Sequence, residues 1–200
     1  MTNKWTNLLS WYNAEKGLKP SFPDICETRD VFQARLDGFF RQLINNHVPL
    51  NDASLLVAIT GEIGNNSYDH NIGHWKDRPG CWFEFTINDH SIYIAIADRG
   101  QGIWNSLKSV DPALDSPQKA IEAAFERIIS GRHPEDRGNG LKFVRSVINC
   151  QKPRGLVCFS DSGSVHFGMN GQAVKSEIFK NLPVPLSTQG TLMLIDWKFS

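Results

Sequence analysis

Apolar side chains recur every three to four residues along the first quarter of the chain, which predicts two amphipathic helices. The first stripe ends near Gly17 and consists of Trp5, Leu8, Leu9 and Tyr12. The second covers about residues 30–46 and consists of Val31, Leu36, Phe39, Phe40, Leu43 and Ile44. Segment 18–26 carries Pro20 and Pro23 and predicts an extended connector. Both stripes indicate core packing, and a docking surface for a partner is the alternative for the first.

A third apolar stripe follows a helix cap at Asn51 or Asp52 and predicts a helix to about Gly73. Its members are Leu55, Leu56, Ile59 and Ile63. Apolar and polar residues then alternate over residues 81–87 and resume after an Asn88-Asp89-His90 turn. This two-residue period is that of a strand, so it predicts a β-hairpin that ends at Asp98.

The second half of the chain predicts two further helices and three short strands. Ser116 and Pro117 are typical of a helix start and Gly131 of a helix end, within a segment that otherwise predicts a loop. Residues 141–150 predict the other helix. The predicted strands are residues 156–160, 165–168 and 191–197, the first two joined across Asp161-Ser162-Gly163.

These elements predict an α/β fold. Its form is a two-layer α/β sandwich, with a mixed, mainly antiparallel sheet of about five strands and helices on one face. A chain of 200 residues suits one domain with an appendage. We therefore expect residues 1–50 to form an N-terminal helical extension and residues 51–200 to form the functional domain.

Charge and cysteine content exclude several functional classes. The 21 basic residues balance the 21 acidic ones, so no overall field attracts nucleic acid or an anionic membrane. The four cysteines lack a zinc-finger spacing and are typical of buried free thiols. No segment resembles a signal peptide or reaches the ~20 apolar residues that cross a bilayer. We therefore expect a cytoplasmic protein that binds neither nucleic acid nor membranes.

The third predicted helix carries residues that oppose helix formation, in the segment TGEIGNNSYDH at positions 60–70. Each interior glycine costs about 0.8 to 1 kcal/mol relative to alanine, and asparagine is also a poor helix former. Spacings of three and four residues place five polar side chains on one face: Glu62, Asn65, Asn66, Asp69 and His70. A solvated face would favour Lys, Glu and Gln instead. This face therefore predicts a binding site.

Two alternatives remain for the polar face. It is a plain solvated surface, or His70 and His74 bind zinc together, since they are four residues apart. The zinc alternative requires the helix to continue past Gly73 and lacks a third ligand at useful spacing.

A glycine-rich turn follows the predicted hairpin. The apolar strand delivers Asp98 into D-R-G-Q-G, where Gly100 and Gly102 allow backbone to approach a ligand closely. An ordinary turn at the end of a strand is the alternative. A dinucleotide-binding fingerprint is excluded, because it needs a glycine at the position of Asn105.

A second glycine-rich segment, RHPEDRGNGL at residues 132–141, directly precedes a predicted helix. The free amides and the dipole of a helix N-terminus suit a phosphate. Arg132, Arg137 and Lys142 add cations that strengthen such contacts. This segment predicts a phosphate site, and an ordinary charged loop is the alternative.

Four motifs, in this order, resemble the N, G1, G2 and G3 boxes of the GHKL ATPase superfamily. They are E-x-x-x-N in a helix, D-x-G-x-G after a strand, G-x-G-L before a helix, and Gly190-Thr191 at the start of the last strand. The resemblance covers about residues 51–197 and implies the Bergerat fold, with ATP and Mg²⁺ as ligands. The pattern of Glu62, Asn66 and His70 is most similar to that of the compact anti-sigma-factor serine kinases.

The resemblance implies a role for each matching residue. Asp98 would accept a hydrogen bond from the adenine amino group, helped by a water that Thr191 orients. Asn66 would bind Mg²⁺, which prefers oxygen ligands, and Glu62 would act as the general base. Gly138 and Gly140 would offer amides to the phosphates, beneath a mobile lid at about residues 103–137. The other expected nucleotide-binding residues are Asp69, His70, Gly100, Gly102, Arg132, Arg137, Asn139 and Leu141.

Two functions follow from this resemblance. The first is ATP-dependent phosphotransfer to a hydroxyl of a partner protein, with Glu62 as base. The second is an ATP-gated interaction switch with slow or no hydrolysis. A sensor histidine kinase fits less well, because His47 precedes Val48-Pro49 and no histidine has the context of a phosphoacceptor. Gyrase-like and mismatch-repair-like enzymes would need a further domain after Trp197. A protein partner is expected in either case, and homodimer formation is left open.

Overall fold

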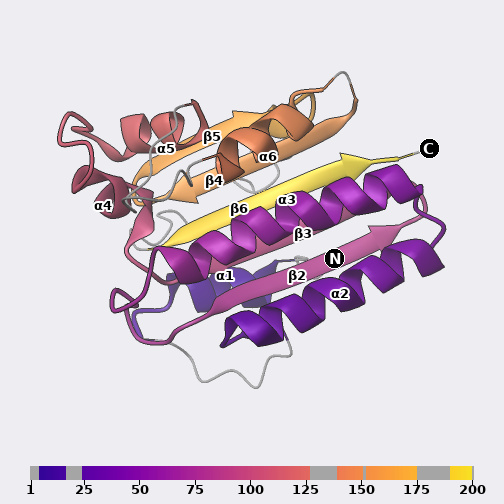
Figure 1. Ribbon diagram of the computed structural model, residues 1–200, viewed down its shortest axis with the longest axis horizontal. Helices are drawn as coiled ribbons and strands as arrows, with labels where there is room; N and C mark the ends of the chain where they lie inside the picture. The colour runs from indigo at the N-terminus through magenta and orange to yellow at the C-terminus, as the bar shows by residue number, and fades with distance from the viewer. Residues whose placement is uncertain (1–4, 17–23, 127–138, 151, 175–189, 200) are drawn as a thin grey trace.

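Six strands form one open sheet in the computed structural model, which describes residues 5–16, 24–126, 139–150, 152–174 and 190–199 (Figure 1). Each strand is antiparallel to its neighbours, in the order β1-β2-β3-β6-β4-β5. The strands are β1 (Ile25–Cys26), β2 (Cys81–Asn88), β3 (Ser91–Asp98), β4 (Arg154–Ser160), β5 (Gly163–Phe167) and β6 (Thr191–Lys198). The described helices are α1 (Thr6–Asn13), α2 (Arg29–Asn45), α3 (Leu50–Asp69), α4 (Gly102–Lys108), α5 (Pro117–Glu126) and α6 (Gly140–Ile148).

The two hairpins predicted from alternation are confirmed. β2 pairs with β3 from Cys81 opposite Asp98 to the Asn88 turn, and β4 pairs with β5. β6 lies between β3 and β4, with Leu192 opposite Ala97. The start of β6, at Thr191, is therefore beside the end of β3 that carries Asp98.

The predicted count of about five strands is wrong, because the sheet has a sixth strand, β1. Ile25 pairs with Trp82 and Cys26 with Cys81, at the edge of the sheet. This strand lies in the segment predicted to be an extended connector. Two residues are too few to show the alternation by which a strand is identified in a sequence.

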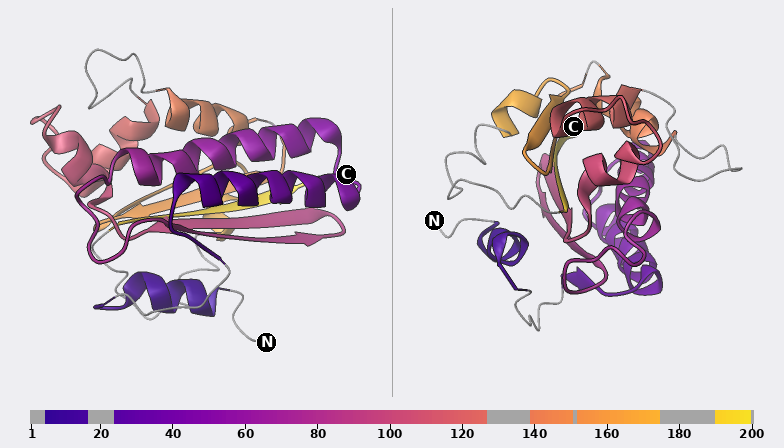
Figure 2. Two further views of the ribbon diagram at one scale, coloured as in Figure 1. Left: turned by 60° about the horizontal axis from the view of Figure 1, so that its bottom comes forward. Right: turned by 90° about the vertical axis from the view of Figure 1, so that its left-hand side faces the viewer.

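Helices α2, α3 and α6 cover one face of the sheet (Figures 1 and 2). α2 and α3 approach closely at Gly64, where a Cβ would overlap the Phe32 ring. A Cβ on Gly61 would likewise come within 3.3 Å of Leu36. These two glycines, which oppose helix formation, therefore make room for α2. The sequence pattern around the polar face does not indicate this packing role.

The expectation of helices on one face is wrong for α1, which lies on the opposite side of the sheet (Figure 2, left). Its buried residues are Leu8, Leu9, Trp11 and Tyr12. They pack against the second face of the central strands, on Trp82, Ala95, Ala97, Val157, Phe159, Leu192 and Leu194. β3 reads Ile94-Ala95-Ile96-Ala97, so both of its faces are apolar and both need cover.

One helix boundary differs from the prediction, and one helix was not predicted. α3 ends at Asp69, before Gly73, and residues 102–108 form α4 in a segment predicted to be a loop. α5 begins at Pro117 as predicted, while its predicted end at Gly131 lies outside the described residues. The predicted helix near residues 141–150 is confirmed as α6.

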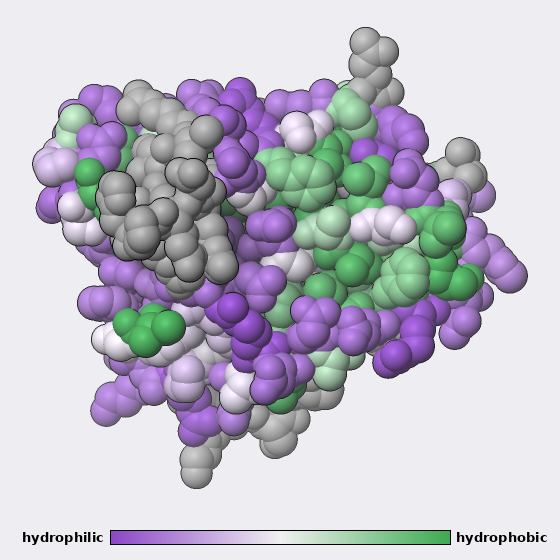
Figure 3. All heavy atoms as spheres, in the orientation of Figure 1, coloured by the Kyte–Doolittle hydropathy of each residue, from purple (hydrophilic) through white to green (hydrophobic). Residues whose placement is uncertain are grey.

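The exposed surface over the helical layer is partly apolar. On the face seen in Figure 3, apolar side chains gather toward the right, where α2 ends and α3 begins. Ile44 and Leu50 are the large exposed apolar residues at these two ends. None of the described helices combines the length and the apolar character needed to cross a bilayer. Cys26, Cys81 and Cys158 are buried free thiols as expected, and Cys150 is a half-buried one.

Candidate functional site

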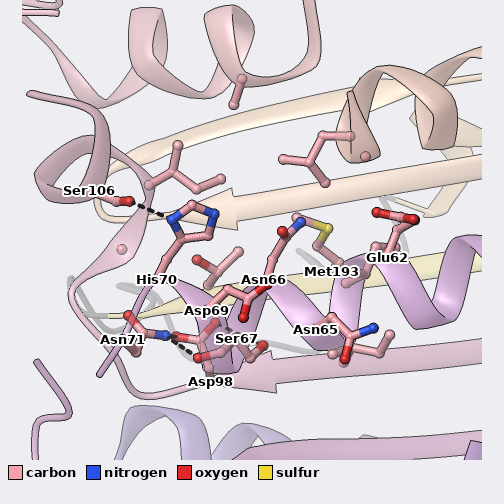
Figure 4. A pocket seen from close by; sticks show the side chains of 18 of the residues that line it. Glu62, Asn65, Asn66, Ser67, Asp69, His70, Asn71, Asp98, Ser106 and Met193 are labelled. Atoms are coloured by element: carbon pink, nitrogen blue, oxygen red, sulfur yellow. Dashed lines mark hydrogen bonds between the residues drawn. The ribbon is translucent and has the colours of Figure 1, made fainter. Parts of the chain in front are cut away.

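A cavity of about 510 Å³ lies between α3, the adjoining ends of β3 and β6, and the starts of α4 and α6 (Figure 4). This volume is in the range of small-molecule sites. Ten of the residues expected to bind or turn over nucleotide line it: Glu62, Asn66, Asp69, His70, Asp98, Gly102, Asn139, Gly140, Leu141 and Thr191. The fold therefore brings residues from four distant segments to one place.

Asp98 is the buried carboxylate at one end of the cavity, only 5 % exposed. Its Oδ1 accepts hydrogen bonds from Gly100 N at 2.9 Å and from Asn71 Nδ2 at 3.2 Å. Its Oδ2 accepts one from Ser67 Oγ at 3.3 Å. Burial raises the pKa of Asp98 to about 6, because desolvation outweighs the hydrogen bonds that lower it, including one from the Thr191 backbone. Hydrogen bonds thus hold the carboxylate in place, and at pH 7, above a pKa of about 6, its ionised form predominates.

Asn71 is a site residue that the sequence motifs do not identify. Its amide donates to Ser67 O at 2.9 Å and to Asp98, and its Oδ1 accepts from Gln101 N at 3.0 Å. It therefore joins the end of α3 to the turn after β3. The one sequence signal for Asn71 is its position directly after the polar face of α3, at residue 71.

Gly100 does not line the cavity, contrary to its expected place in the nucleotide site. A Cβ at this position would overlap the side-chain amide of Asn71. The glycine is needed because Asn71 packs against the backbone there. Gly100 therefore contributes to the site indirectly, because it leaves room for the Asn71 side-chain amide that donates to Asp98.

Glu62 lies toward the other end of the cavity, and Asn66, one helical turn further along α3, lies between Glu62 and the Asp98 end (Figure 4). The Glu62 carboxylate reaches Gly140, the first residue of α6, where a Cβ would overlap its Oε2. Asn139 caps α6 with no side-chain hydrogen bond, so its own side chain leaves the first amides of α6 unoccupied. A carboxylate, an amide and a helix N-terminus therefore face one another.

Asp69 and His70 line the same cavity and contact residues that the motifs do not include. Asp69 forms an ion pair with Arg29 at the start of α2. His70 Nδ1 lies 3.2 Å from Ser106 Oγ on α4. Arg29 and Ser106 also line the cavity, and no local pattern could place them there, because they are 40 and 36 residues away from their partners.

Thr191 and Gly102 line the same end of the cavity as Asp98, where β3 ends and β6 begins. The Thr191 hydroxyl lies 3.4 Å from Ser160 Oγ, which accepts from Ile103 N at 2.8 Å. Gly102 has φ +78° and leaves room for the Asp161 carboxylate. α4 therefore begins at a residue whose backbone requires glycine.

The metal-binding alternatives differ in how well the described residues fit them. No group of three His, Cys, Asp or Glu side chains converges among these residues, so His70 and His74 lack a third zinc ligand there. His74 lines a separate shallow hollow with Lys76 and Gln101. Asn66 offers one neutral oxygen to the main cavity, which fits Mg²⁺ only when a polyanionic ligand supplies the remaining charge.

Three expected phosphate-binding residues, Arg132, Arg137 and Gly138, lie outside the described part of the chain. No protein-family model matches this sequence, and no curated protein matches it significantly. The functional conclusion therefore depends on the cavity and on the chemistry of its side chains.

Proposed function

We propose that this chain is a Mg²⁺-ATP-binding domain of the GHKL type that transfers phosphate to a partner protein. The observation that carries the proposal is the arrangement of one cavity: a buried carboxylate at one end, and a carboxylate, an amide and a helix N-terminus at the other. A ligand that satisfies both ends presents a hydrogen-bond donor on a flat base and an anion at some distance from it. ATP has both groups.

The base end suits adenine. The Asp98 carboxylate lines this end of the cavity, and the apolar side chains of Ile63, Ile96 and Met193 line it as well. An ionised acceptor favours the amino group of adenine and opposes the carbonyl oxygen that guanine presents at the same position. Asp98 therefore gives a physical basis for preferring ATP to GTP.

The phosphate end suits a metal-bound triphosphate. The first amides of α6, near Gly140, favour an anion. Glu62 lies against the same helix start and would be repelled by a bare triphosphate, so Mg²⁺ is needed between them. Asn66, one turn along α3, supplies an oxygen for that ion and adds no negative charge.

Glu62 is the residue that turns binding into chemistry in this proposal. Its carboxylate is exposed and lies beside the predicted phosphate position. It would accept the proton of an incoming hydroxyl as that oxygen attacks the terminal phosphate, whose bond to the β–γ bridging oxygen breaks so that ADP leaves. Bound Mg²⁺ would supply charge neutralisation there. Without a hydroxyl acceptor the same site would act as an ATP-gated switch.

The test is transfer of labelled phosphate. Wild-type protein and Glu62→Ala are each incubated with γ-labelled ATP, Mg²⁺ and the proteins that co-purify with the chain. We expect a labelled partner with the wild type and none with Glu62→Ala. Nucleotide-dependent complex formation without label would replace the kinase by the switch. Absence of nucleotide binding would contradict both functions.

A further inference from the structure

Arg99 is a fully buried cation that the proposed chemistry does not use. It directly follows Asp98 and is only 1 % exposed. Its Nη1 donates to Trp11 O at 2.6 Å and Tyr12 O at 2.9 Å, and its Nη2 donates to Ala14 O at 2.7 Å. These three carbonyls belong to the C-terminal end of α1, where a helix leaves its carbonyls without helical partners.

The charge of Arg99 is balanced by Asp77. Arg99 Nε lies 3.1 Å from Asp77 Oδ1, and Nη2 lies 2.8 Å from Oδ2, which is a two-point ion pair. The guanidinium is therefore held between the loop after α3 and the end of α1. All of its nitrogen atoms have partners, so the side chain has one position while α1 is docked.

The backbone of Arg99 is equally constrained. Its carbonyl accepts from Lys76 N at 2.9 Å. A Cβ on Gly190 would overlap Asp98 O and approach Arg99 Cα, so the entry to β6 packs directly on this peptide. Arg99 thus occupies a point where α1, the loop after α3, and the strands β3 and β6 meet.

We propose that Arg99 is a positioning residue that couples α1, on the far face of the sheet, to the nucleotide cavity. With α1 docked, three carbonyls fix the guanidinium, and the Asp98 turn keeps the shape in which Gly100 N and Asn71 hold the carboxylate. When α1 leaves, Arg99 loses these acceptors and retains only Asp77. The buried cation then turns toward water, and the turn that carries Asp98 moves with it.

This coupling makes α1 a control element for nucleotide binding. α1 spans only eight residues, Thr6–Asn13, and is held by one apolar face and by the Arg99 hydrogen bonds. Its contact area is therefore smaller than that of the long helices, and we expect its docking to be weaker. Linkage is reciprocal: if docking of α1 favours nucleotide, nucleotide favours docking by the same factor. A partner that takes up the apolar face of α1 would lower the affinity of the cavity. This inference rests on the proposed ATP site.

Two variants test the coupling from its two ends. Arg99→Met removes the guanidinium, and Leu8→Asp places a charge on the buried face of α1 without touching the cavity. Arg154→Met is the matched control, because Arg154 is also buried and ion-paired, with Asp52 at 2.7 Å. It lies opposite Trp197, near the end of β6 that is remote from Asp98. Each protein is titrated with Mg²⁺-ATP, and amide exchange is followed by NMR.

We expect both Arg99→Met and Leu8→Asp to raise the ATP dissociation constant by about tenfold or more, within the range of measured couplings. The Gly100 and Gln101 amides, which donate to Asp98 and Asn71, should exchange faster in both variants and not in Arg154→Met. Combining the two substitutions should add little, because both remove the same link. In the wild type, Mg²⁺-ATP should slow exchange in α1.

The outcomes separate this inference from the proposed function. Wild-type protein that fails to bind ATP contradicts the function. Wild-type protein that binds ATP, with unchanged affinity in a folded Leu8→Asp variant, contradicts the coupling alone. Should Arg99→Met fail to fold, Leu8→Asp and the ATP effect on α1 exchange in the wild type still decide the matter.

Discussion

Replacing Asp98 by asparagine should make the protein more stable at neutral pH and at the same time a poorer ATP binder. Asparagine keeps an oxygen for the two donors at Oδ1, Gly100 N and Asn71 Nδ2. The Ser67 hydroxyl, which donates to Oδ2, can rotate and accept from the new amide instead. The substitution therefore removes a charge with little change in shape.

The size of the stability effect follows from the pKa of Asp98. Burial raises that pKa from 3.8 to about 6, which corresponds to about 3 kcal/mol against the ionised folded state at neutral pH. Because the folded pKa is the higher one, the contribution of Asp98 to the free energy of unfolding is full below pH 3.8. It is lost as the pH rises through about 6. The difference in free energy of unfolding between Asp98→Asn and wild type should thus grow by about 2 to 3 kcal/mol from about pH 4 to about pH 7.5.

The binding effect has the opposite sign. The asparagine nitrogen would face the amino group of adenine, and the charge-assisted hydrogen bond would be lost. This costs about 1.5 to 3 kcal/mol, at least a tenfold loss of affinity. Denaturant unfolding across the pH range measures the first quantity, and calorimetric titration with Mg²⁺-ATP measures the second.

Asp52→Asn is the matched control. Asp52 is also buried, but it pairs with Arg154 at 2.7 Å, away from the cavity. Its loss should lower the free energy of unfolding and leave ATP affinity unchanged. A stability difference for Asp98→Asn that is flat with pH would refute the raised pKa. Unchanged ATP affinity would remove Asp98 from the base site.

Three further substitutions test the rest of the cavity. Glu62→Ala should keep ATP affinity within a few fold and reduce turnover by about a hundredfold or more, measured by steady-state kinetics; equal loss of both would make Glu62 structural. Asn66→Ala should abolish the Mg²⁺ dependence of ATP binding, and ATP should no longer protect α4 in hydrogen exchange. Stoichiometric zinc in the nucleotide-free wild-type protein would overturn the magnesium assignment. Gly100→Ala should weaken ATP binding by displacing the Asn71 amide. In its control Gly38→Ala the new Cβ would meet only the Arg41 side chain, at 3.9 Å, so binding should be unchanged and the free energy of unfolding should rise by about 0.5 to 1 kcal/mol. Equal affinities of the two alanine variants would contradict the indirect role of Gly100.

Periodicity predicts the long elements of this fold because each has one face in a core. The α3 stripe and the alternation of β2 and β3 are long enough to carry their own period. β1 and α4 are too short for this. β1 pairs with β2 at the edge of the sheet, and the start of α4 packs at Gly102 against the Asp161 carboxylate, so both depend on tertiary contacts. Ala95 and Ala97 make the second face of β3 apolar as well, and this is the feature of the sequence that could have predicted cover by α1 on that face.

The candidate site follows the same division. Glu62, Asn66 and Asp98 lie in motifs, and the resemblance carried by those motifs implied the shared cavity that these residues line. Arg29 and Ser106 reach it only through tertiary packing and have no local signal. Glycine was the least reliable indicator, because Gly64 and Gly100 are required by the Phe32 ring and the Asn71 amide, not by a ligand.

The most direct test of the account is a comparison of ATP and GTP binding to the wild-type protein in the presence of Mg²⁺. Asp98 is a buried carboxylate that accepts hydrogen bonds at Oδ1 from Gly100 N and from the Asn71 side-chain amide. It should distinguish a base that offers an amino group from one that offers an oxygen. We predict saturable, Mg²⁺-dependent ATP binding with GTP at least about tenfold weaker. Equal affinity for the two nucleotides, or no binding of ATP, would contradict the account.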